Sequence, residues 1–80
     1  MQEQDVSFAS LREGERARVL HFANMREHYR NRLLSMGLTP GTEFRVERRA
    51  PLGDPVEISL RGFRLTLRRD EAREMRVQPL

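Results

Sequence analysis

Residues 56–67 read VEISLRGFRLTL, and this stretch decides the fold. Apolar residues alternate with polar ones on both sides of Arg61-Gly62, and alternation with a period of two is typical of strands that bury one face. A two-residue connection between two such runs predicts a β-hairpin, although Arg-Gly is a weaker turn signal than Asn-Gly. The sequence therefore predicts paired strands over 56–60 and 63–67.

Further strands are predicted on both sides of this hairpin, over 17–22, 43–47 and 75–77, with one helical turn over 70–74. About five short strands result, and a small β-domain of this size usually hides its edges by curling into a barrel. We expect the following residues to line one barrel interior: Phe44, Val46, Val56, Ile58, Leu60, Phe63, Leu65 and Leu67.

One helix is predicted over residues 25–36, between the first two strands. Asn24 fits the N-cap, and Gly37 fits the residue that follows the C-cap in a Schellman ending. Residues 39–42 read TPGT, which fits a type II turn. Four apolar residues recur at i, i+4, i+8 and i+11 and should face the barrel: Met25, Tyr29, Leu33 and Met36.

Length and composition limit the chain to one small domain. It has 80 residues and no cysteine, which excludes a disulfide, a thiolate zinc site and a thiol nucleophile. All 15 basic residues are arginine, and 12 acidic residues interleave with them, for a net charge of +3. Residues 1–9 are expected to be a flexible arm, in which Phe8 alone could pack against the core, and residues 10–80 the domain. No targeting or membrane-spanning segment is expected.

Catalytic and metal-binding patterns are missing from the sequence. The serines lie in no nucleophile motif, and the glycines are isolated rather than gathered in a phosphate-binding loop. His21 and His28 lack the spacing of metal ligands, so they are expected to be ordinary histidines. We therefore expect no enzyme activity, no cofactor, no dedicated metal site and at most weak iron binding.

Three stretches carry a specific combination of helix and turns. Residues 29–41 read YRNRLLSMGLTPG, residues 50–56 read APLGDPV and residues 65–68 read LTLR. Together they resemble the FeoA family of ferrous iron transport proteins, and the resemblance extends over about residues 10–78. It implies an all-β fold with a small helical insertion, namely a five-stranded SH3-like barrel with a helix after the first strand.

The resemblance also implies a role. FeoA proteins are small cytoplasmic companions that are thought to bind and support FeoB, the membrane transporter of ferrous iron, which carries a cytosolic GTPase domain. A protein of this kind is expected to be a cytoplasmic monomer that meets the membrane only through its partner. A similar barrel is appended to repressors of the diphtheria-toxin-repressor type, but the sequence contains no helix-turn-helix segment, which favours a stand-alone companion.

A small nucleic-acid-binding barrel is the alternative, because arginine suits phosphates. A base-stacking platform needs exposed aromatic side chains on the sheet. Phe44 and Phe63 are expected in the core instead, so no nucleic-acid partner is predicted.

Two surface features are candidates for contact with the transporter. Leu34 falls on the polar side of the helix, about 180° from Met25, beside Arg30, which suits an acidic partner. The loop over 51–55 is the second feature, because loops on a rigid barrel often carry binding. Structural interpretations stay open for both, since single exposed leucines are common and prolines also stiffen turns. The predicted partner-binding residues are Leu34, Arg30, Pro51, Leu52 and Asp54.

Overall fold

A computed structural model describes residues 4–80 of the chain. Within this range, no helix is long and apolar enough to cross a membrane. In chain order the elements are β1 (Val6–Ser7), the 3₁₀ helix η1 (Phe8–Ser10), β2 (Arg16–Phe22), α1 (Glu27–Ser35), β3 (Glu43–Arg49), β4 (Val56–Leu60), β5 (Phe63–Leu67), α2 (Arg69–Ala72) and β6 (Met75–Pro79).

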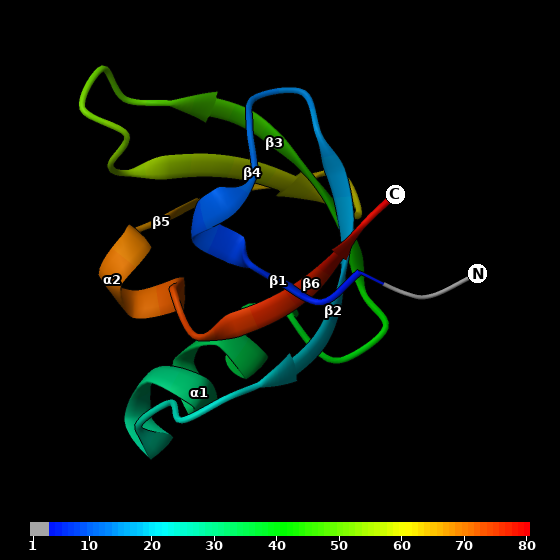
Figure 1. The fold of residues 1–80 in the computed structure, drawn as a ribbon, viewed down its shortest axis with the longest axis vertical. Helices are drawn as coiled ribbons and strands as arrows, with labels where there is room; N and C mark the ends of the chain where they lie inside the picture. The colour runs from blue at the N-terminus through cyan, green and yellow to red at the C-terminus, as the bar shows by residue number, and fades with distance from the viewer. Residues whose placement is uncertain (1–3) are drawn as a thin grey trace.

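The strands form one antiparallel sheet in the order β1-β6-β2-β3-β4-β5. Figure 1 shows the sheet curving around the interior, with α1 at its lower end and α2 at its left side. The predominantly β fold is confirmed, but the prediction of a closed five-stranded barrel is wrong, because the sheet has six strands and stays open. The sixth strand explains the opening: β1 pairs Val6 with Val77 and Ser7 with Arg76, so it occupies the edge of β6 that closure would need.

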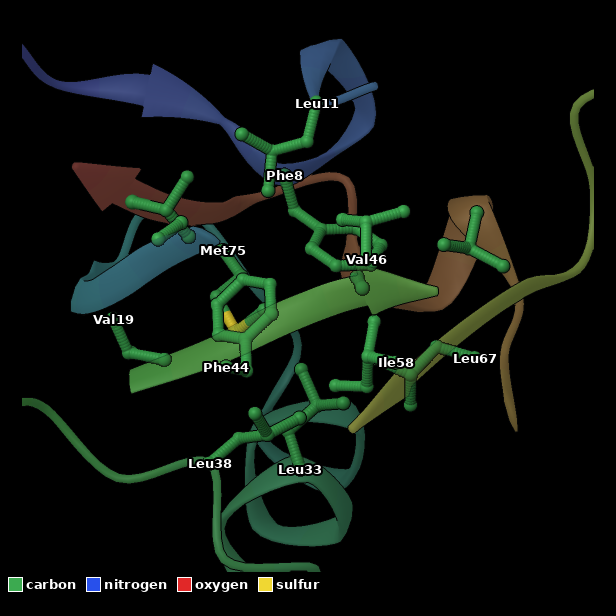
Figure 2. Close-up of a cluster of buried hydrophobic side chains, with 14 of the residues drawn as sticks. Phe8, Leu11, Val19, Leu33, Leu38, Phe44, Val46, Ile58, Leu67 and Met75 are labelled. Carbon is green, nitrogen blue, oxygen red and sulfur yellow. The ribbon is translucent and has the colours of Figure 1, made fainter. Parts of the chain in front are cut away.

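The hydrophobic core lies on the inner face of this sheet. Figure 2 shows Leu33 and Leu38 extending from α1 and the segment after it toward Ile58 on β4. Among the eight residues predicted to line the interior, six are buried, and Leu65 is half-buried against them. Phe63 is 69% exposed, so its assignment to the core is wrong.

Helix α1 is shorter than predicted at its N-terminus. Asn24 has a positive φ of 50° and does not cap the helix. The N-cap position belongs to Arg26, whose side chain makes no capping hydrogen bond. The apolar stripe nevertheless faces inward as expected: Leu33 is buried, Met25 and Met36 pack against the core, and Tyr29 is half-buried.

The N-terminal segment requires a correction from residue 6 onward. The flexible arm expected over residues 1–9 is replaced by β1 and η1, and Phe8 is fully buried. The Phe8 ring lies 5.8 Å from that of Phe44, centroid to centroid, and Leu11 is buried beside it. Residues 1–3 of the predicted arm lie outside the described residues. The folded domain therefore begins near residue 6 rather than residue 10.

Asp5 ties this segment to two strands. Its Oδ1 accepts a hydrogen bond from Arg76 Nε at 2.6 Å, and its Oδ2 lies 3.0 Å from His21 Nε2. The hydrogen bonds from Arg76 and His21 lower the pKa of Asp5 below its ordinary value of 3.8. The unfolded chain therefore takes up this proton at a higher pH than the folded chain does, and the stabilisation is present above pH 3.8 and lost below it.

An Asp5→Asn variant should show a weaker loss of stability in acid. Because its side chain cannot take up the proton, its free energy of unfolding should fall less steeply than that of the unmodified chain as the pH drops below about 4. Urea unfolding at a series of pH values measures this difference. Parallel pH dependences for the two proteins would show that Asp5 is not held by Arg76 and His21.

Candidate functional site

The structure separates the residues that the sequence predicted as a partner surface. Leu34 and Arg30 lie on α1, whereas the loop over 51–55 connects β3 to β4. Figure 1 places α1 and this loop at opposite ends of the longest axis of the molecule. Leu34 is half-buried rather than fully exposed, and Arg30 is exposed. The two features therefore cannot form one continuous contact patch.

Asp54 has a structural task within its loop. Its Oδ1 accepts a hydrogen bond at 2.8 Å from the backbone N–H of Arg69, the first residue of α2. Such a bond satisfies one of the free amide groups at a helix N-terminus. Leu52 is 92% exposed, and Pro51 beside it is also exposed. Asp54 thus stabilises the loop, while Leu52 is left as a single apolar side chain in water.

An apolar groove lies between the C-terminal end of α1 and the β4–β5 hairpin. Its volume is about 370 Å³, at the lower end of the range of ligand pockets. Phe63, 69% exposed, is the largest exposed side chain at the groove. The lining residues are Ser35, Met36, Gly37, Leu60, Arg61, Phe63, Arg64 and Leu65.

Two local structures make the walls of this groove. The hairpin turns through Arg61 and Gly62, both with positive φ, at 49° and 83°, which is the type I′ geometry favoured between two strands. On the other wall, α1 ends in the predicted Schellman motif: Leu38 N–H donates to Leu33 O at 3.1 Å, and Gly37 has φ 96°. Both walls follow from signals that are visible in the sequence.

Phe63 is exposed because of where the hairpin lies. It pairs with Leu60 across the hairpin, so both side chains are on the inner face of the sheet. The turn after α1 lies against Leu60, since a Cβ built on Gly37 would lie 3.6 Å from Leu60 Cδ1, and Leu60 is only 5% exposed. In the described part of the chain, β5 is the edge strand of the sheet and has no neighbour on its other side. The alternation predicted the correct face for Phe63 but not that the core ends before it.

The groove carries positive charge at its rim. Arg61 and Arg64 are among its lining residues, and no acidic residue is. Arg64 Nη1 lies 3.2 Å from Glu57 Oε1, with the arginine side chain 67% exposed. For Arg61, no ion pair is found within residues 4–80. An exposed aromatic ring beside arginines, over an apolar floor, is the composition typical of a protein interface.

Within residues 4–80, two smaller hollows have charged side chains among their lining residues. One, of about 260 Å³, lies beside the hairpin and is lined by Arg16, Glu43 and Arg45 among others. The other, of about 200 Å³, lies between α1 and the segment around α2 and is rimmed by charges of both signs. In neither hollow does a large exposed apolar side chain occur, so the groove at Phe63 is the stronger candidate.

The histidines do not converge with other potential metal ligands. His21 contacts Asp5, and the ring of His28 lies 4.1 Å from that of Tyr29, centroid to centroid. Across residues 4–80, no three or more histidine and carboxylate side chains gather as a metal site would require.

Comparison with known proteins identifies the family. A model of the FeoA domain matches residues 6–79, nearly the whole described chain. The chain belongs to the FeoA family. Its SH3-like fold is confirmed by two solved relatives, the FeoA-like protein from Clostridium acetobutylicum and the FeoA protein from Chlorobium tepidum.

The two FeoA structures match along most of their length. The Clostridium protein is 30% identical with a TM-score of 0.87, and the match covers 100% of this chain and 91% of that one. The Chlorobium protein is 40% identical with a TM-score of 0.84, and the match covers 94% of this chain and 70% of that one. The domain start near residue 6 agrees with the limits of the FeoA match.

A manganese-dependent transcriptional repressor shares the fold alone. It is 15% identical with a TM-score of 0.87, and the match covers 99% of this chain but only 43% of the repressor. The FeoA fold therefore also occurs as one part of a larger protein.

Proposed function

We propose that this FeoA-family chain is a cytoplasmic accessory protein of ferrous iron uptake that binds a FeoB-type transporter through the groove at Phe63. The FeoA family is associated with ferrous iron uptake and is not a known family of enzymes. The observation that carries the binding role is the exposure of Phe63 at the border of an apolar groove, because apolar surface that is continuous and rimmed by polar residues is typical of interaction sites. The role proposed is binding rather than catalysis.

The composition of the groove favours a protein partner. Aromatic residues and arginine are enriched at the energetic centres of protein interfaces. Phe63 supplies apolar area on a rigid hairpin, and Arg61 in the turn supplies charge at the rim. Leu34 with Arg30 on α1, and Leu52 with Pro51 in the β3–β4 loop, are the competing contact surfaces, but neither borders an apolar hollow.

One observation supports binding of nucleic acid, namely an exposed aromatic ring, but the several rings of a base-stacking platform are not found in the part of the chain that the structure describes. Phe63 is an exposed aromatic side chain beside two arginines, contrary to its predicted burial. Sheets that bind RNA stack two or three bases on several aromatic rings. Within residues 4–80, Phe63 is the only exposed phenylalanine or tyrosine. A single ring does not make such a platform, so the protein partner is preferred.

Replacing Phe63 by aspartate should weaken transporter binding at least tenfold, or about 1.4 kcal/mol. The change removes the apolar contact and places a charge over the apolar floor. Because Phe63 is mostly exposed, the fold should keep nearly all of its stability. Affinity is measured by titrating the purified detergent-solubilised transporter with the labelled chain.

Two matched variants locate the contact. Leu52→Asp introduces the same charge at a leucine that is 92% exposed in the β3–β4 loop, and Leu34→Asp introduces it on α1. Both variants should bind the transporter with an affinity within about twofold of that of the unmodified chain, a much smaller change than the tenfold loss expected for Phe63→Asp. Normal binding by Phe63→Asp, with loss in either of the other two, would place the interface on the surface predicted from the sequence instead. No binding by the unmodified chain would refute the transporter as its partner.

A further inference from the structure

Strand β5 leaves one row of backbone groups free. Among the described residues, it is the last strand of the open sheet and pairs only with β4. Leu60 and Phe63 flank the two-residue turn, and in such hairpins this pair exchanges its backbone hydrogen bonds. Hydrogen bonding then alternates along the strand, so the N–H and C=O groups of Arg64 and Thr66 point away from β4. Within residues 4–80, no other backbone group bonds to them.

The free edge runs along the apolar groove. Phe63, Arg64 and Leu65 belong to β5 and also line one wall of the groove. The opposite wall is the end of α1 around Met36. A strand that pairs with β5 would send every second side chain toward the inner face of the sheet, where the groove lies, and the others toward the outer face. Backbone pairing and the filling of the groove are therefore compatible in one extended segment.

The positive charge along β5 favours a partner segment with acidic side chains. Residues 60–68 read LRGFRLTLR, with three arginines and no acidic residue. Arg64 is on the outer face, opposite to Phe63 and Leu65, because side chains alternate along a strand. Its Nη1 lies 3.2 Å from Glu57 Oε1 on the neighbouring strand, and the side chain is still 67% exposed to a further acidic partner. A partner strand with acidic side chains on its outer face would place them beside Arg64, and opposite charges across strands are stabilising.

We propose that β5 binds an extended segment of a partner protein as an added seventh strand, in which apolar residues that enter the groove alternate with acidic residues that face Arg64. Strand addition of this type takes affinity from the backbone and specificity from alternate side chains. The inference rests on the proposed function for the identity of the protein that carries the segment, namely the transporter.

A second copy of this chain fits the edge less well. Two β5 strands paired with each other would bring Arg61, Arg64 and Arg68 of both copies along one seam, with no acidic residue in either strand. Like charges that oppose each other across strands are destabilising. The partner is therefore a segment of different composition.

The test uses synthetic peptides, so that it does not depend on the transporter. The probe is Asp-Val-Glu-Leu-Asp-Val-Glu-Leu, and its charge-reversed control is Lys-Val-Lys-Leu-Lys-Val-Lys-Leu. We expect the acidic peptide to bind at least ten times more tightly than the basic one. Thr66→Pro should weaken binding of the acidic peptide at least tenfold, because proline removes the outward N–H while an edge strand tolerates it. Thr66→Val keeps the N–H and should bind within about twofold, since only the side chain changes.

A second measurement on the unmodified chain covers the case in which Thr66→Pro does not fold. Backbone hydrogen exchange should slow at Arg64 and Thr66 when the acidic peptide is added. Unchanged exchange at these two amides, equal binding of both peptides, or no binding at about 1 mM acidic peptide would overturn the proposal. So would protection of both amides that rises with protein concentration alone, because a second copy would then cover β5. If peptide binding succeeds but the transporter does not bind, the edge site stands and the proposed function fails.

Discussion

Phe8→Ala is expected to lower the free energy of unfolding by about 3–5 kcal/mol. The side chain is fully buried, its ring packs against Phe44, and its removal would leave a cavity that the short helix η1 cannot fill. A domain of this size has a total stability of about 4–12 kcal/mol, so the loss is a large share of it. Urea unfolding followed by circular dichroism measures the change.

The matched control for Phe8 is Leu52→Ala, which removes a side chain that is 92% exposed and should change stability by less than about 0.5 kcal/mol. A variant lacking residues 1–9 should not fold stably, since it also loses β1. Full stability of that truncated chain would show that the segment is the loose arm that its sequence suggested.

Ile58→Ala should cost about 2–5 kcal/mol by the same mechanism of lost burial and a residual cavity. Ile58 is fully buried at the centre of β4, opposite Leu65 on β5. Phe63→Ala is the matched control on the same hairpin. The alternation places both residues on the inner face, yet only Ile58 lies within the core, so Phe63→Ala should leave stability nearly unchanged. Equal losses in the two variants would contradict the exposure of Phe63.

Local patterns predicted most of the fold. The alternation over 56–67 predicted β4, β5 and the tight turn between them, and Gly37 marked the end of α1. These signals act between residues that are close in the sequence. β1 gave no such signal, because two residues show no alternation and its partner β6 lies at the far end of the chain. Without β1, the sheet appeared to need closure into a barrel.

The candidate site was less predictable for a related reason. A period of two says which face a side chain takes, but not where the core beneath that face ends. Phe63 is on the predicted face and yet exposed, whereas its cross-strand neighbour Leu60, which lies against the turn after α1, is buried. The position of Phe63 directly after a turn, between Arg61 and Arg64, was the one signal available in the sequence. Leu34 was selected from the phase of the helix, from the neighbouring Arg30 and from its place in a stretch that resembles the family, and the structure shows it to be half-buried.

The most direct test of the account is a nuclear magnetic resonance titration of the isotope-labelled chain with the cytosolic domain of a FeoB-type transporter. The backbone amide signals report contact residue by residue. The account predicts that the largest shifts occur at residues 35–37 and 60–66, on the two walls of the groove and the free edge of β5. Shifts confined to Arg30 and Leu34, or to the loop over 51–55, would contradict it, as would a spectrum that the transporter domain leaves unchanged.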